Sequence, residues 1–345
     1  MPHATAQEDP YNFSMAWAER DSYGYGRNPP NPHWPNGAKV AVNFVLNYEE
    51  GGERTIEDGD AAAETNGQEM PGLPAKAGAR APDIESQFDF GSRVGIWRIL
   101  DLFEGHGIPI TFYAVARAFE AAMENGHEVA SHCYRWLPHH EMEPAEEEEL
   151  IRKAVQSFRK TSKVPCGWFY GRPSANSCAL VEKVYKEEGE EFLYWADYYA
   201  DELPVWTCRP THVSEESKEG LLLMPYNLHN NDFKLWHGQY GSAELWARNC
   251  VDSVKTVIDE AKAGKRHGYI TIPLHTRWFV LLSRTILLVI VEHPGRFQAL
   301  KRMVEDIVAM GDVWFATRES IARHWIKEYP YGSLPKRKPT HEKIA

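Results

Sequence analysis

The sequence predicts an α/β fold in which a sheet of about six or seven parallel strands, flanked by helices, closes into a barrel. Short runs of apolar and β-branched residues alternate with longer helical runs along most of the chain. No long Gly- or Pro-rich linker divides the chain into halves, which favours a single domain over residues 39–330. A length of 345 residues suits one such barrel with additions at its ends.

The individual elements follow from local patterns. Residues 39–47 (KVAVNFVLN) are dense in apolar residues and predict a buried strand, whereas residues 51–81 are rich in Gly, Ala and Glu and predict a long loop. Apolar residues at helical spacing predict a helix over 92–104, and Pro144 followed by glutamates predicts the start of another. The later strands are predicted at 108–115, 127–131, 167–170, 192–195, 221–224, 269–273 and 313–315. The later helices are predicted between residues 115 and 127, at 176–188, 242–263 and 294–310, and from residue 317.

Three segments fall outside this alternation. Residues 1–38 are rich in Pro, Gly, Asn and aromatic residues and predict an N-terminal wrap. Residues 278–292 form an atypical apolar insertion, predicted as a helix or loop that lies over the barrel mouth or protrudes from it, with a buried helix or strand pair as the alternative. Residues 331–345 form a basic tail.

Charge and cysteine content limit the possible partners. Lys and Arg number 38 and Asp and Glu number 49, so the net charge is −11, which argues against nucleic acid and anionic membranes as partners. The apolar run at 278–291 is shorter than the roughly 20 residues that span a bilayer. The five cysteines form no CxxC pair and the chain starts with polar residues, which predicts a cytoplasmic protein without disulfides.

Polar residues gather at the predicted carboxyl ends of four strands, where parallel α/β folds carry their sites. The four segments are NYEEGGE (47–53), SHCYRW (131–136), GWFYGRP (167–173) and PLHTR (273–277). Carboxylates, histidines and arginines are the groups that general acid–base hydrolysis requires. The sequence contains no GxSxG or phosphate-binding loop motif.

These motifs resemble those of the polysaccharide deacetylase superfamily, which implies a distorted (β/α) barrel. The resemblance is closer to the metal-independent allantoinase subgroup, through NYEEGGE (47–53) together with YGRNPP (25–30) and DYYADELP (197–204). It covers about residues 20–330, although the insertion at 278–292 has no counterpart. Relatives with the same motifs are often named chitin deacetylases.

The resemblance implies catalytic roles for Glu49, Glu50, His132 and His275. In metal-dependent relatives a pair of aspartates stands in place of Glu49 and Glu50, one as the base and the next as a metal ligand. Because side chains alternate along a strand, only one of the two glutamates faces the cleft. Glu50 is favoured because it aligns with the inward metal ligand, and Glu49 is the alternative. His132 would orient water or polarise the carbonyl, and His275 would donate a proton to the leaving nitrogen.

Substrate contacts are expected from arginines, aromatic residues and loop aspartates near the same strand ends. The candidates are Arg135, Trp136, Trp168, Tyr170, Arg172, Asp197, Asp201 and Asp232. Packing in the core is an alternative role for the aromatic residues, and a structural ion pair is an alternative for Arg135.

The resemblance places Trp136 where the family has a second metal-binding histidine, and an indole cannot ligate a metal. No cofactor is therefore expected; if zinc or cobalt is bound, Glu50 and His132 would hold it. The predicted function is hydrolysis of a carbon–nitrogen bond in a small cyclic ureide such as allantoin, by a chain that forms homo-oligomers as members of the subgroup tend to do. Two alternatives are deacetylation of chitin or another N-acetylated sugar, and an inactive barrel that serves as a binding protein.

Overall fold

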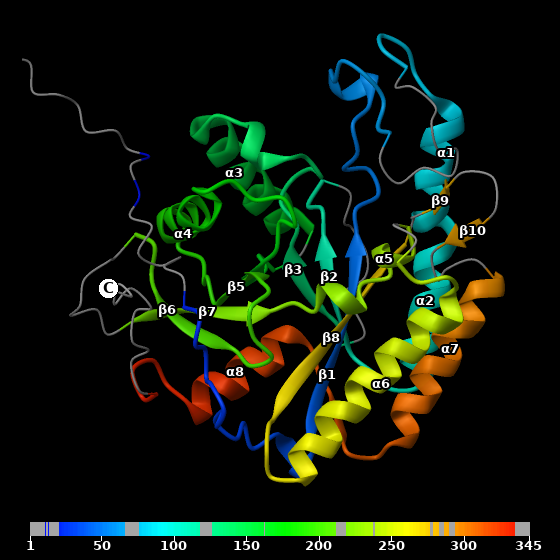
Figure 1. The fold of residues 1–345 in the computed structure, drawn as a ribbon. Helices are drawn as coiled ribbons and strands as arrows, with labels where there is room; N and C mark the ends of the chain where they lie inside the picture. Colours follow the sequence, from blue (N-terminus) through cyan, green and yellow to red (C-terminus); the bar gives the residue numbers. More distant parts are fainter. Residues whose placement is uncertain are drawn as a thin grey trace, which may run out of the picture.

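The computed structural model describes residues 11, 13, 21–65, 76–117, 126–161, 163–211, 219–236, 239–276, 279–282, 286–289 and 294–334. In this part of the chain, nine strands form one curled sheet, in the order β11-β1-β2-β3-β4-β5-β7-β6, with β8 on the other edge of β1 (Figure 1). All but β6 run parallel, which confirms the predicted barrel class and exceeds the six or seven parallel strands expected.

The sheet alternates with helices along the chain. The strands are β1 (Val40–Tyr48), β2 (Ile110–Ala114), β3 (Glu128–Ser131), β4 (Gly167–Trp168), β5 (Tyr194–Tyr198), β6 (Val205–Cys208), β7 (Gly220–Pro225), β8 (Gly268–His275) and β11 (Val313–Phe315). The helices are α1 (Pro82–Phe90), α2 (Ile96–Gly105), α3 (Pro144–Thr161), α4 (Ser177–Glu188), α5 (Phe233–Trp236), α6 (Ala243–Lys262), α7 (Pro294–Ala309) and α8 (Arg318–Glu328). A π-helical turn, Gly91–Gly95, joins α1 to α2, so the predicted helix at 92–104 begins ten residues earlier, at Pro82.

Each strand has one face toward the helices and one toward the barrel interior. On β1 the larger apolar residues, such as Val42 and Phe44, pack in the core cluster shared with the helices. The intervening Ala41 and Val45 belong to a second cluster inside the barrel, which also contains Tyr113. Odd-numbered residues of β1 therefore point inward and even-numbered residues point outward.

The pairing register brings the carboxyl ends of the central strands to one level. Tyr48 pairs with Ala114, Ala114 pairs with Ser131, and Ser131 pairs with Trp168. The residue after each of these positions therefore lies one step further at the same mouth of the barrel. On the other edge of β1, Asn47 pairs with His275 at the end of β8.

The barrel is not closed by pairing between β7 and β8. Instead, the chain at 227–232 runs along the second edge of β8: Thr271 N–H donates to Asn227 Oδ1 at 2.7 Å, and Asp232 N–H donates to the Pro273 carbonyl at 3.1 Å. The fully buried Arg318 donates to the Pro225 carbonyl at 2.7 Å and to Thr271 Oγ1 at 3.2 Å, so it links β7 to β8.

Segments at the periphery differ in how far they match expectation. The described part of the N-terminal segment packs on the barrel, since the Tyr25 ring lies against Trp325 at an interplanar angle of 57° and Trp34 Nε1–H donates to the Gly268 carbonyl at 3.1 Å. Within the apolar insertion, β9 (Phe279–Leu282) and β10 (Ile286–Val289) pair antiparallel as a separate hairpin in contact with α5. The predicted helix or loop at this point is therefore wrong, and the strand pair is the observed form. The helix predicted between residues 115 and 127 and most of the basic tail lie outside the described residues.

Candidate active site

Three of the four predicted catalytic side chains meet at the inner face of the barrel mouth. Glu49 follows β1, His132 follows β3, and His275 ends β8. Glu49 Oε1 lies 2.9 Å from His132 Nε2 and 3.9 Å from His275 Nε2. Their exposed fractions are 2%, 3% and 5%, so the group is enclosed rather than spread over an open surface.

The contacts of His132 define where its protons lie. Its Nδ1 is 3.0 Å from the Phe169 carbonyl, which can only accept a hydrogen bond, so Nδ1 carries a proton. Its Nε2 faces Glu49 Oε1, and one further proton must lie between these two atoms. The pair therefore holds either an imidazolium with a carboxylate or a neutral imidazole with a carboxylic acid.

His275 is held by a buried aspartate. Asp232, which is fully buried, accepts from His275 Nδ1–H at 2.7 Å and from the His275 backbone N–H at 2.9 Å. Burial raises the pKa of the Asp232 carboxyl, and the adjacent His275 opposes this shift. With Nδ1 engaged, Nε2 of His275 is the ring atom that faces Glu49. Asp232 was expected to contact the substrate, but its carboxylate is directed at His275.

Glu50 lies on the other face of β1. Its Oε1 accepts a hydrogen bond from Thr276 Oγ1, and it packs against the π-helical turn at Gly91. A Cβ at Gly91 would lie 2.1 Å from Glu50 Oε1 and 2.7 Å from the Thr276 carbonyl oxygen. The expectation that one glutamate of the pair faces the barrel mouth agrees with this geometry, but the residue beside the two histidines is Glu49 and not the favoured Glu50.

Arg135 is engaged by the loop after β1. Its guanidinium donates to Asp60 Oδ2 at 2.5 Å and to the Glu53 carbonyl at 2.9 Å, and it lies 3.5 Å from Asp58 Oδ2. The structural ion pair considered for Arg135 is therefore present, and it holds the 53–60 loop to the segment that follows β3.

The remaining aromatic candidates separate into two groups. Trp136 is partly exposed, and the Arg172 guanidinium lies 3.8 Å above the centre of its ring. Arg172 also donates to the Trp136 carbonyl at 3.3 Å. In contrast, Trp168 and Tyr170 are buried in the outer core cluster, where Trp168 packs on Tyr185. For these two residues core packing, the alternative to a place in the pocket, is the observed position, because they alternate with Phe169, which belongs to the cluster inside the barrel.

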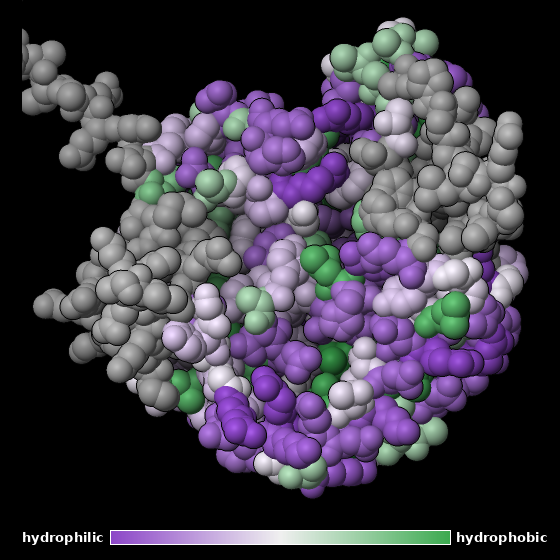
Figure 2. Space-filling model, viewed as in Figure 1, coloured by the Kyte–Doolittle hydropathy of each residue, from purple (hydrophilic) through white to green (hydrophobic). Residues whose placement is uncertain are grey.

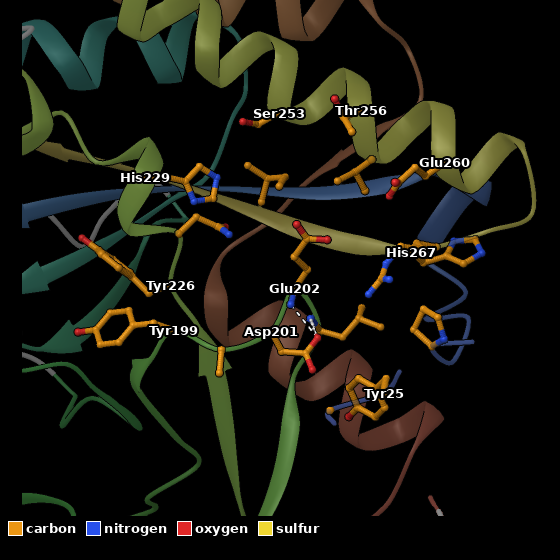
Figure 3. A pocket seen from close by; sticks show the side chains of 18 of the residues that line it. Tyr25, Tyr199, Asp201, Glu202, Tyr226, His229, Ser253, Thr256, Glu260 and His267 are labelled. Atoms are coloured by element: carbon orange, nitrogen blue, oxygen red, sulfur yellow. Dashed lines mark hydrogen bonds between the residues drawn. The ribbon is translucent and has the colours of Figure 1, made fainter. Parts of the chain in front are cut away.

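The loop aspartates also differ in position. Both carboxylate oxygens of Asp197 accept hydrogen bonds from backbone N–H groups, those of Tyr170 and Gly171, at 2.7 Å each. Asp201 lines an open groove of about 1210 Å³ (Figure 3), and its Oδ1 accepts from the N–H of its neighbour Glu202 at 2.8 Å. None of the three central residues is among the described residues that line this groove. Hydrophilic residues predominate on the face seen in Figure 2.

Sequence reasoning missed Asn47 and its partner Tyr226, which lie beneath the central group. Asn47 Nδ2 donates to the Leu274 carbonyl at 3.0 Å and approaches the Tyr226 hydroxyl at 3.4 Å, so it ties β1 to β8 under Glu49. The signal was present in β1, where Asn43, Asn47 and Glu49 are polar residues on one alternating face of an otherwise apolar strand.

The donor set does not fit the three-ligand site that catalytic zinc requires. The Trp136 ring lies against Arg172, and its indole nitrogen can only donate a hydrogen bond. Among the residues described, no group of three or more His, Cys, Asp or Glu side chains is arranged to hold a metal ion.

No helix in the same part of the chain is long and apolar enough to cross a membrane.

Comparison with known proteins supports a family relationship. Residues 76–190 match the polysaccharide deacetylase family. A protein of Schizosaccharomyces pombe named "Putative polysaccharide deacetylase" is 38% identical over 331 residues, which cover 90% of this chain and 98% of that protein.

Several solved structures share the fold, and two of them are also similar in sequence over most of the chain. PuuE allantoinase has a TM-score of 0.78 and 36% identity, with 90% of this chain and 98% of that chain covered. A probable polysaccharide deacetylase from Pseudomonas aeruginosa PAO1 has a TM-score of 0.77 and 35% identity, with 90% and 99% covered. Proteins of this group are hydrolases that act on carbon–nitrogen bonds other than peptide bonds, and so is this chain. From its sequence identity, its coverage and its curled barrel, the chain belongs to the polysaccharide deacetylase family.

Proposed function

We propose that this chain opens the ring of a small cyclic ureide, with allantoin as the first candidate substrate. The observation that carries the proposal is the enclosed position of Glu49 between His132 and His275. An enclosed centre suits a small molecule better than a polymer that must lie across it. The similarity to PuuE allantoinase over 90% of the chain supports the same choice.

The three side chains supply the groups that amide hydrolysis needs. Glu49 takes a proton from water, and the resulting hydroxide attacks the ring carbonyl carbon. His132, protonated at Nδ1 and at Nε2 when Glu49 is ionised, stabilises the developing oxyanion. His275 donates its Nε2 proton to the nitrogen as the carbon–nitrogen bond breaks. Because Glu49 Oε1 and His275 Nε2 lie 3.9 Å apart, a small movement lets the proton that Glu49 took from water pass to His275. This transfer restores both groups for the next turnover.

Asp232 and Arg172 support this chemistry. The buried Asp232 stabilises the protonated form of His275 and fixes which ring nitrogen faces the substrate. Arg172, stacked on Trp136, presents a planar cation with donors that match the carbonyl oxygens of a ureide. Together they favour a polar, flat substrate.

We further propose that the reaction uses no metal. Relatives of the deacetylase type rely on metal ligands that this chain replaces, since an indole stands at one ligand position. A carboxylate that activates water alone suits a strained, electron-poor cyclic ureide better than an unactivated sugar acetamide.

Deacetylation of an N-acetylated sugar is the second candidate, favoured by the 38% identity to the Schizosaccharomyces pombe protein and its name. A substrate panel separates the two. We expect purified protein to convert allantoin to allantoate and to release no acetate from N-acetylchitooligosaccharides. Acetate release without allantoin turnover would transfer the assignment to the deacetylase. Turnover of neither would favour the inactive barrel.

The remaining predictions concern the setting of the enzyme. We propose a homo-oligomeric cytoplasmic protein whose barrel domain spans residues 39–330 and which binds no nucleic acid, in keeping with its net charge of −11. Light scattering coupled to size-exclusion chromatography tests the oligomeric state, and a monomer would contradict it.

A further inference from the structure

The loop that follows β4 carries the backbone partner of His132. Strand β4 is only two residues long, and its last ladder bond is Phe169 N–H to the Ser131 carbonyl at 2.9 Å. Beyond this point the chain turns at Gly171, whose φ is +72°, and a Cβ built there would lie 3.8 Å from His132 Cε1. The loop therefore lies against the imidazole, and something other than the sheet must hold it.

Asp197, on the neighbouring strand β5, holds this loop. Its Oδ2 accepts from Tyr170 N–H and its Oδ1 from Gly171 N–H, both at 2.7 Å. Hydrogen bonds of backbone N–H groups to a carboxylate are short and about twice as strong as those between neutral groups. The Tyr199 hydroxyl, also labelled in Figure 3, donates to Oδ1 at 3.1 Å from the solvent side.

One peptide group connects Asp197 to His132. The Phe169 carbonyl that accepts from His132 Nδ1 at 3.0 Å belongs to the same peptide unit as the Tyr170 N–H that donates to Asp197. A carboxylate on the N–H side of a peptide polarises its carbonyl and makes it a better acceptor. The chain of contacts runs from Asp197 through the peptide 169–170 to Nδ1 of His132.

The arrangement parallels that of the second histidine. Nδ1 of His275 contacts an aspartate directly. Nδ1 of His132 instead contacts the carbonyl of a peptide group whose N–H donates to an aspartate. In both cases a buried acceptor orients the ring and leaves Nε2 toward Glu49. The outward position of Asp197 on β5 explains how it reaches the backbone of this loop without entering the barrel mouth.

We propose that Asp197 is a positioning residue that acts through the 169–170 peptide to fix the orientation and the Nδ1 proton of His132. This role differs from the substrate contact expected of Asp197, because its two oxygens already accept from the protein. The proton position is a property of the free protein. Its effect on turnover rests on the proposed function.

The test compares Asp197→Asn with Asp201→Asn in protein labelled with ¹⁵N-histidine. In the wild type we expect His132 to show a protonated Nδ1 in long-range ¹H–¹⁵N spectra, with the signal assigned by its loss in His132→Gln. An amide cannot accept from both N–H groups without turning its own NH₂ toward one of them. Asp197→Asn should therefore shift the Hδ1 signal of His132 upfield or broaden it by exchange.

Asp201→Asn is the matched control, since Asp201 also accepts from two backbone N–H groups, but those of Glu202 and Leu203. We expect it to leave the His132 signals at their wild-type positions. In the allantoin assay Asp197→Asn should lower kcat by about 10- to 100-fold with little change in KM, the range typical of residues that orient a functional side chain.

Unchanged His132 signals in folded Asp197→Asn would overturn the proposal, even if activity fell. Should that variant not fold, Tyr199→Phe decides. It removes the competing donor from Oδ1 at a half-exposed position, so the His132 Hδ1 signal should move downfield, and no movement would overturn the proposal. If the wild type does not hydrolyse allantoin, the proposed function fails while the NMR comparison still tests Asp197.

Discussion

Exchange of each glutamate for glutamine tests which face of β1 carries the catalytic base. Glu49→Gln removes a carboxylate that lies within 4 Å of both histidines and leaves a side chain of nearly the same shape. Glu50→Gln removes a carboxylate that points away from them and accepts from Thr276. The two substitutions are chemically identical and one residue apart, so each serves as the control for the other.

The expected magnitudes differ widely. A positioned general base contributes about 10²–10⁴-fold to rate, so Glu49→Gln should lower kcat for allantoin by that factor, or roughly 3–5 kcal/mol of transition-state stabilisation. A glutamine at position 50 retains an oxygen that can accept from Thr276, so Glu50→Gln should change kcat by less than about tenfold.

Steady-state kinetics with allantoin, accompanied by circular dichroism to confirm folding, measures both variants. A large loss in folded Glu50→Gln with near wild-type turnover in Glu49→Gln would refute the assignment of the inner and outer faces. Equal and large losses of kcat in both variants would show that the two carboxylates act together. This result would contradict their positions on opposite faces of the chain at the end of β1.

Three further predictions concern stability, the second histidine and pH. Gly91→Ala should lower the free energy of unfolding in urea by about 1–3 kcal/mol, because its Cβ would collide with Glu50 and Thr276. Gly105→Ala, whose Cβ would have nothing within 4 Å, should leave that free energy unchanged, and equal stabilities of the two variants would contradict the packing. Asp232→Asn should reduce kcat by at least about 10²-fold with a smaller effect on KM, and wild-type kinetics would remove Asp232 from the acid pair. Burial raises the pKa of Asp197 to about 6, so activity should decline below about pH 6, because the protonated acid loses one of its two backbone N–H partners. If the pH dependence of activity in Asp197→Asn showed the same decline at low pH, this prediction would be contradicted.

The pH prediction depends on the groups that face Asp197. These are the phenols of Tyr170 and Tyr199, the thiol of Cys178 and the imidazole of His132. Burial raises the pKa of the phenols and of the thiol, so these three stay neutral across the range measured. The comparison with Asp197→Asn then isolates the titration of the aspartate.

Most of the fold followed from local pattern. Runs such as KVAVNFVLN were correctly interpreted as buried strands because both faces of a parallel sheet are covered, so the apolar residues are continuous. Strand β6 and the short helix α5 were missed, since four-residue elements carry too little periodicity. For the hairpin of β9 and β10 a helix or loop was predicted, with a strand pair as the alternative, because an apolar run alone does not distinguish these forms.

The site was predictable in membership but not in orientation. The register of β1, β3 and β8 brings Glu49, His132 and His275 together, and the four motif-bearing strand ends pointed to that mouth. Glu50 was favoured because it aligns with the inward metal ligand of relatives. Alternation along β1 instead marks Asn43 and Asn47 as inward residues, and Glu49 lies on their face whereas Glu50 does not. The pairing of His275 with Asp232 could not be read from spacing, because it depends on how residues 227–232 follow the unpaired edge of β8.

Metal depletion tests directly whether Glu49, flanked by two histidines, activates water without a metal. Purified wild-type protein is dialysed against EDTA, its zinc content is determined by mass spectrometry, and allantoin turnover is measured before and after. We expect substoichiometric zinc at the start and unchanged kcat/KM afterwards. Stoichiometric metal, with activity abolished by chelation and restored by zinc or cobalt, would contradict it.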